Sequence, residues 1–200
     1  MFRKLKDGFL YAVAKIIFLL AGWKLGGNLP ANIKKCVMIA APHTSNWDIV
    51  FTRAAFALLD VPVRFTIKKE WFDSPIGFFI KFIGGIPIDR NLKREEGKRN
   101  SIVEGMIALF DQNEQLTVLV TPEGTRSLAT KWKTGFYHVA VGGQVPIALG
   151  FVDYKNKIAG VGKVIFPTGD FEKEMREIMD FYKEITPKYP ERFSVDLRYN

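Results

Sequence analysis

Residues 36–48 read CVMIAAPHTSNWD, an apolar run that leads directly into a polar turn. The run has the length and composition of a buried strand, and the residue types at 44–46 are ones that cap helices. We therefore predict a strand followed by a helix that begins near position 45 or 46. His43 then lies at the end of the strand and Asp48 in the first helical turn, where the two side chains can touch.

Strand-like and helical patterns alternate along the chain. The strand-like runs lie at 36–41, 61–67, 116–121, 145–152 and 158–166, and the helical patterns at 47–59, 74–83, 97–112, 134–141 and 170–185. Such an alternation indicates a largely parallel sheet with helices on both faces. The fold class we predict is α/β, a single domain with a mostly parallel central sheet flanked by helices. Ligands in such sheets bind at the carboxyl ends of the strands.

The first 25 residues are basic and then apolar, and they allow two interpretations. Lys15 interrupts the apolar stretch 9–23, so the segment does not resemble an ordinary membrane-spanning helix. It is either an amphipathic helix in the membrane interface or the buried first helix of the domain. Residues 1–35 carry a net charge of +6 within the +8 of the whole chain, which favours an anionic partner. We predict a membrane-interface segment at 1–28 and the main domain at 29–200.

His43 and Asp48 have the chemistry of a base and its orienting acid. An imidazole near a helix N-terminus lies in a positive dipole that favours the neutral, proton-accepting form. A hydrogen bond to Asp48 would fix the ring tautomer and support the imidazolium that forms on proton transfer. A pair that only caps the helix would show the same spacing, so the pair alone does not decide between catalysis and capping.

Two further polar segments are expected at the same edge of the sheet, GGIPIDR at 84–90 and TPEGTRS at 121–127. Arg90 offers a planar fork suited to phosphate. Glu123 can accept hydrogen bonds from ligand hydroxyls, while Arg126 and the turn amides can hold a phosphate. In isolation, each segment is more simply explained as a solvated surface turn.

Together and in this order, the segments resemble the motifs of glycerolipid acyltransferases, the family that includes lysophosphatidic acid acyltransferases. The motifs are H-x-x-x-x-D at 43–48, a G-x-[IV]-x-[IV]-x-R-like run at 84–90, EGTRS at 123–127 and VPI at 145–147. The resemblance covers about residues 36–150. The HTSNWD form of the first motif and the stretch WKTGFYH at 132–138 are similar to a compact bacterial subgroup.

The resemblance implies an O-acyltransferase that moves a fatty acyl chain from an acyl thioester to a hydroxyl of a lysophospholipid-like acceptor, such as 1-acyl-glycerol-3-phosphate. His43, oriented by Asp48, would act as general base, and the acceptor would attack the thioester without an acyl-enzyme. Acyl-CoA or acyl carrier protein would be the donor, with no further cofactor. The residues expected to bind substrate are Lys68, Lys69, Gly85, Arg90, Glu123, Gly124, Thr125, Arg126 and Pro146.

The expected setting is a membrane surface. We expect a peripheral or monotopic protein on the cytoplasmic face of the inner membrane, with anionic lipids, the lyso-lipid acceptor and the thioester donor as partners, and no nucleic acid. Cys36, His43 and His138 match no zinc spacing, and we expect His138 to be a structural histidine. A competing hypothesis from another class is a non-catalytic module that binds anionic lipid or phosphate at the membrane surface.

Overall fold

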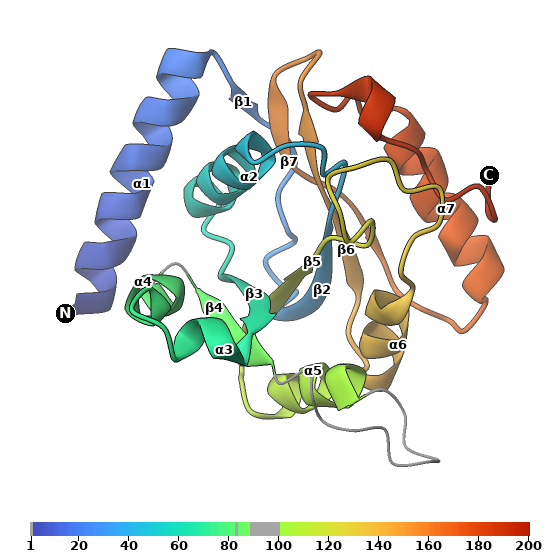
Figure 1. The fold of residues 1–200 in the computed structure, drawn as a ribbon, viewed down its shortest axis with the longest axis horizontal. Helices are drawn as coiled ribbons and strands as arrows, with labels where there is room; N and C mark the ends of the chain where they lie inside the picture. The colour runs from blue at the N-terminus through green and yellow to red at the C-terminus, as the bar shows by residue number, and fades with distance from the viewer. Residues whose placement is uncertain (1, 83, 89–100) are drawn as a thin grey trace.

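Parallel strand pairing organises the chain, which the computed structural model describes over residues 2–82, 84–88 and 101–200. Within these residues the strands form one seven-stranded sheet in the order β1-β7-β6-β2-β5-β3-β4 (Figure 1). Neighbouring strands are parallel except for β6 and β7, which form an antiparallel hairpin. The predicted α/β class with a mostly parallel sheet is therefore confirmed. The strands are β1 (Lys24–Leu25), β2 (Lys35–Ala40), β3 (Val63–Lys68), β4 (Gly85–Ile88), β5 (Leu116–Val120), β6 (Ile147–Asp153) and β7 (Ile158–Ile165).

Helices cover both faces of this sheet. The helices are α1 (Phe2–Ala21), α2 (Trp47–Leu58), α3 (Lys69–Phe72), α4 (Gly77–Phe82), α5 (Ser101–Asp111), α6 (Gly135–Gly142) and α7 (Phe171–Lys183), followed by a short 3-10 helix, Pro190–Arg192. Helices α5, α6 and α7 pack on one face of the sheet, and α1 and α2 lie on the other (Figure 1). Within the helical pattern at 97–112, α5 contributes Met106 and Phe110 to the core that it shares with α6 and α7.

Strand β2 is buried on both of its faces, which explains its unbroken apolar sequence. Val37 and Ile39 pack in the core that contains α5, α6 and α7, while Cys36 and Met38 pack in the core on the side of α2. Successive side chains of a strand point to opposite faces, so a central strand covered on both sides has no exposed position for a polar residue. Strand β2 ends at Ala40, and His43 follows after Ala41 and Pro42.

Helix α1 has one buried and one exposed side. Ala14 and Phe18 are buried in a cluster that includes Ala54 and Ala55 of α2. On its other side, apolar residues face outward, and the side chain of Leu20 is 82% exposed. The packed side agrees with the expected first helix of the domain, and contact of the exposed side with a membrane stays a prediction. None of the described helices combines the length and the apolarity that crossing a bilayer requires.

The predicted division at residue 28 runs through shared structure. Besides the packing of α1 on α2, the two residues of β1 pair with β7 at the edge of the sheet. The segment 1–28 thus contributes to the same folded body as residues 29–200. Its separate role at a membrane stays a prediction.

Candidate active site

The loops that follow β2 and β5 meet at the carboxyl edge of the sheet, because these two strands are parallel neighbours. The backbone N–H of His43, in the first loop, donates a hydrogen bond to Oε1 of Glu123, in the second loop, at 2.8 Å. The guanidinium of Arg126 donates to the side-chain oxygen of Asn46 across the same gap. Two of the three segments predicted to form one cleft are therefore joined by direct contacts.

His43, in the loop after β2, and Asp48, in the first turn of α2, lie side by side. Nδ1 of His43 is 3.4 Å from Oδ2 of Asp48. The same oxygen accepts hydrogen bonds from the backbone N–H groups of Thr44 at 2.7 Å and Ser45 at 2.8 Å. The Asp48 carboxylate thus fixes the backbone turn and faces the imidazole at the same time. The predicted contact between His43 and Asp48 is present in the structure.

The second oxygen of Asp48 is also occupied. Oδ1 accepts hydrogen bonds from the hydroxyl of Tyr154 at 2.7 Å and from Oγ of Ser45 at 3.2 Å. Burial raises the pKa of Asp48, but the hydrogen bonds that the carboxylate accepts, from His43 and Tyr154 first, lower it by more. The net effect is a pKa below the ordinary value for aspartate, so Asp48 is ionised at neutral pH and can stabilise a protonated imidazole.

Glu123 is a buried acid, with a residue exposure of only 4%. Burial raises its pKa to about 8, the hydrogen bond from the His43 backbone opposes this shift, and the nearby negative charge of Asp48 adds to it. At neutral pH Glu123 is therefore mostly protonated. The sequence predicted that Glu123 binds ligand hydroxyls, whereas in the structure its Oε1 binds the main chain of His43.

The rest of the EGTRS segment forms an exposed turn. Oγ1 of Thr125 accepts a hydrogen bond from the N–H of Ser127 at 3.1 Å, which is a turn-stabilising contact. Gly124 has a φ of +69°, a conformation that glycine adopts without strain. A side chain at this glycine would also collide with Lys133, because an ideal Cβ would lie 2.5 Å from its Nζ. The ammonium of Lys133 therefore lies directly against the turn.

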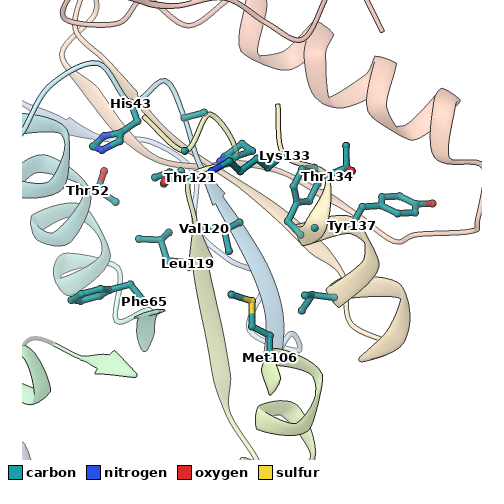
Figure 2. A pocket seen from close by; sticks show the side chains of 18 of the residues that line it. His43, Thr52, Phe65, Met106, Leu119, Val120, Thr121, Lys133, Thr134 and Tyr137 are labelled. Atoms are coloured by element: carbon teal, nitrogen blue, oxygen red, sulfur yellow. The ribbon is translucent and has the colours of Figure 1, made fainter. Parts of the chain in front are cut away.

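A large cavity opens beside these loops, with a volume of about 1670 Å³. Figure 2 shows His43 on one side of its lining and Met106 of α5 on another, with Leu119 and Val120 at the end of β5 between them. The lining as a whole is mostly apolar and includes Phe65, Met106, Ile107 and Leu119. Because the cavity places an apolar wall within reach of the imidazole, it can hold an aliphatic chain with one end near His43.

The structure locates the other predicted binding residues unevenly. Lys68 ends β3 and Lys69 begins α3, so their backbones lie at the carboxyl edge of the sheet. Arg90 lies outside the described residues. Gly85 is at the amino end of β4, where a Cβ would collide with Ile80, so the structure gives it a packing role.

Pro146 is also not brought to the site. Its carbonyl accepts a hydrogen bond from the N–H of Val37 at 3.0 Å, at the amino ends of β2 and β6. His43 follows the carboxyl end of β2, at the opposite edge of the sheet. The neighbours of Pro146 in the VPI motif, Val145 and Ile147, are core residues, so the motif serves packing here.

Sequence reasoning missed Tyr154 and Lys133. Tyr154 contacts Asp48 across 106 positions of sequence, and no local pattern marks such a contact. Lys133 belongs to the WKTGFYH stretch, and its position beside Gly124 became visible only in the folded chain. His138 lines the cavity from α6, and its ring stacks on Phe171 with 6.5 Å between the ring centres. Across the described parts of the chain, no group of three or more His, Cys, Asp or Glu residues could hold a metal ion.

Comparisons with known proteins bear on the fold and the family of this chain. No curated protein matches the sequence. Among solved structures, the chain is similar to the 1-acyl-sn-glycerophosphate (LPA) acyltransferase PlsC from Thermotoga maritima, with a TM-score of 0.60 and 19% sequence identity. The match covers 92% of this chain and 80% of that one, and at this identity it shows that the fold is shared. The Acyltransferase family profile matches residues 26–148, a range that contains His43, Asp48 and the EGTRS turn. The chain belongs to the Acyltransferase family.

Proposed function

We propose that this acyltransferase moves a fatty acyl chain from an acyl thioester to a hydroxyl of a lysophospholipid-like acceptor, such as 1-acyl-glycerol-3-phosphate. The observation that carries the proposal is the His43 imidazole, which lies beside the ionised Asp48 and also lines the large, mostly apolar cavity. A base that is held by an acid at the mouth of an apolar space fits the transfer of an aliphatic acyl group to an alcohol.

The position of Asp48 supports a separate role for each ring nitrogen of His43. Nδ1 of His43 faces Asp48, so Nε2 is the nitrogen that takes the proton from the acceptor hydroxyl. The hydroxyl oxygen then attacks the thioester carbonyl carbon to form a tetrahedral oxyanion. When this intermediate collapses, the carbon–sulfur bond breaks and the departing thiolate receives the proton from His43. The products are an ester and a free thiol.

This route needs no acyl-enzyme. Cys36, the single cysteine, is fully buried in β2, and burial raises the pKa of its thiol to about 11. A buried thiol that holds its proton is a poor nucleophile. The donor would be acyl-CoA or acyl carrier protein, and no further cofactor takes part in the proposed reaction.

Positive side chains near the cavity would bind the phosphate of the acceptor. Arg126 is exposed and tied to the His43 turn through Asn46, and Lys133 lines the cavity beside Gly124. Guanidinium and ammonium groups are the usual protein partners of phosphate. Lys68, Lys69 and Arg90 are proposed to complete this positive end of the site. Binding there would hold the acceptor hydroxyl within reach of Nε2 of His43.

The catalytic proposal is tested by incubating the purified protein with labelled acyl thioesters and a panel of lyso-lipids, followed by product analysis. Replacing His43 by Ala removes the base and should lower the rate by about 10² to 10⁴-fold. The matched control is His138→Ala, which removes the other histidine and should change the rate far less. If His43→Ala transferred acyl groups as fast as the unmodified protein, the mechanism would be wrong.

We also propose that the enzyme works at the membrane surface, as a peripheral protein on the cytoplasmic face of the inner membrane. The outward side of α1 supports this, because Leu19 and Leu20 are 78% and 82% exposed. The basic residues of the first 35 positions would contact anionic headgroups.

The membrane proposal is tested with vesicles that contain anionic lipid. Replacing both Leu19 and Leu20 by Ser should weaken binding in a flotation assay without changing the fold, since neither side chain is buried. Leu197→Ser is the matched control, because Leu197 is 57% exposed and lies in the C-terminal segment, outside α1. Equal binding of all variants would place the membrane contact on a different surface.

A further inference from the structure

Tyr154 brings a distant part of the chain to the catalytic pair. It lies in the turn between β6 and β7, and its hydroxyl donates a hydrogen bond to Oδ1 of Asp48 at 2.7 Å. The other described donors to Asp48 all come from the segment 43–45, directly before it in sequence. Tyr154 therefore links the turn between β6 and β7 to the carboxylate of Asp48.

The position of the Tyr154 hydroxyl is fixed from several sides. The backbone N–H of Tyr154 donates a hydrogen bond to the carbonyl of Thr186 at 2.9 Å. Its ring meets Trp23 edge-on, with 5.1 Å between ring centres, and Phe51 of α2 edge-on at 6.0 Å. Trp23 in turn stacks on Phe51 at 4.2 Å. A side chain that is held by its backbone and by two aromatic neighbours loses little further entropy when its hydroxyl binds Asp48.

The two oxygens of Asp48 have different hydrogen-bond partners. Oδ1 faces Tyr154 and the hydroxyl of Ser45, while Oδ2 faces His43 and two backbone amides. Without the tyrosine hydroxyl, the donors on Oδ1 are reduced to Ser45 Oγ at 3.2 Å, a weaker restraint on rotation of the carboxylate.

We propose that Tyr154 is a positioning residue of the reaction, which acts through Asp48 to set both the orientation and the basicity of His43. The inference rests on the proposed function of His43 as general base. A hydrogen bond to a carboxylate withdraws part of its negative charge, so it weakens the attraction between Asp48 and a protonated imidazole. Removing the bond therefore makes the imidazole hold its proton up to a higher pH.

Other charged groups near the pair are unchanged by this perturbation. Glu123 faces it from the loop after β5, and Lys188, from the segment after α7, has its Nζ 6.0 Å from the centre of the Tyr154 ring. Arg126 is linked to the turn through Asn46. Because replacing Tyr by Phe leaves all of these in place, the measured shift belongs to the hydroxyl.

Tyr154→Phe tests the proposal in two ways. First, the chain has only two histidines, so the pH titration of their ring protons can be followed by NMR and assigned with a His138→Gln variant. The midpoint of the His43 titration should rise relative to the unmodified protein, while that of His138 should not move. Second, kcat should fall about tenfold with KM nearly unchanged, and the acid limb of the rate profile should move up with the midpoint.

The matched control is Tyr182→Phe. It also removes a tyrosine hydroxyl that donates to oxygen; Tyr182 is fully buried, whereas Tyr154 is half-buried, and its hydroxyl donates to the carbonyls of Gly150 at 3.0 Å and Ile39 at 3.4 Å, not to Asp48. This variant should lose stability without moving either histidine titration. A fluorinated tyrosine at position 154 keeps the ring and the hydrogen bond but donates more strongly, so it should move the His43 midpoint downward.

A double-mutant cycle with Asp48→Asn decides whether Tyr154 acts through Asp48. In that background, Tyr154→Phe should cost less than about twofold in kcat, since the carboxylate it acts on is gone. Full additivity, or an unchanged His43 titration in Tyr154→Phe, would overturn the inference. Failure of the proposed function is a different result, namely activity that survives in His43→Ala, and the NMR measurement does not depend on activity.

Discussion

Replacing Glu123 by Gln distinguishes between two roles of this residue. Glu123 is either a buried, protonated side chain that holds the His43 backbone or a charged acid that binds the acceptor. Glutamine has the shape of the neutral acid, and its carbonyl oxygen can accept the hydrogen bond from the His43 N–H that Oε1 accepts at 2.8 Å. If Glu123 is protonated in the working enzyme, Glu123→Gln should keep kcat/KM within about threefold near neutral pH. Glu123→Ala leaves the buried N–H unpaired and should cost about 1 to 3 kcal/mol of stability.

The raised pKa of Glu123 also predicts how the stability of the unmodified protein depends on pH. The pKa of Glu123 is raised from 4.5 to about 8 in the folded protein, so the folded state binds more protons than the unfolded state between these values. Stability therefore falls as pH rises through this range, and the fall ends above the folded pKa. Between about pH 5 and about pH 8 this one group should destabilise the protein by about 3 to 4 kcal/mol.

Urea unfolding at a series of pH values measures this effect. The free energy of unfolding of Glu123→Gln should increase relative to the unmodified protein as pH rises, and the difference between the two curves removes the contributions of all other groups. A difference that stays flat across the range would contradict the buried, protonated state. Loss of activity in Glu123→Gln, with the fold intact, would instead assign the carboxylate to acceptor binding.

Two further substitutions probe the cavity and the turn. Met106→Trp reduces the apolar space of the cavity, so kcat/KM should fall for long acyl thioesters and stay unchanged for short ones. A series of acyl-CoA substrates of different chain length measures this effect. An equal loss for all chain lengths would place the acyl chain elsewhere. Gly124→Ala forces a methyl group into the space of Lys133 at a φ of +69° and should cost about 1 to 2 kcal/mol in urea unfolding together with a higher KM for phosphate-bearing acceptors. An unchanged KM in a folded Gly124→Ala variant would argue against a role for this turn in binding phosphate.

Strand β2, the start of α2 and the turn between them were predictable because each depends on residues that are close together in the sequence. The apolar run before His43 gave β2, and the next helix begins at Trp47, within two positions of the expected start. The expected side-chain cap on this helix is absent, because the side chain of Asn46 accepts a hydrogen bond from Arg126. The contact between His43 and Asp48 was also predictable, since both residues belong to one turn.

The less regular strands escaped prediction for physical reasons. Strand β1 has only two residues, and it exists because β7 offers an edge for it to pair with. Strand β4 contains Pro87, which lacks the N–H of a central strand and is tolerated because β4 is the outer strand of the sheet. Neither fact can be read from the short runs themselves.

The contacts that shape the site beyond its central pair are long-range. Glu123 lies 80 positions from His43, and Tyr154 lies 106 positions from Asp48. The motifs identified Glu123 as part of the site but could not say that its oxygen would bind main chain. For Pro146 the motif marked a position that matters for packing at the far edge of the sheet. A motif records that residues occur together, whereas their roles depend on which strand ends they occupy.

The two-sided packing of α1 bears on how this enzyme can be handled. Removing residues 1–28 to improve solubility would expose Ala54 and Ala55, which pack in one cluster with Ala14 and Phe18. It would also remove Trp23, which packs against the ring of Tyr154. Such a shortened protein should aggregate and should lose catalytic power at the same time. Replacing the exposed Leu19 and Leu20 by polar residues is the safer way to prepare the protein without detergent, because the buried side of α1 stays packed on α2.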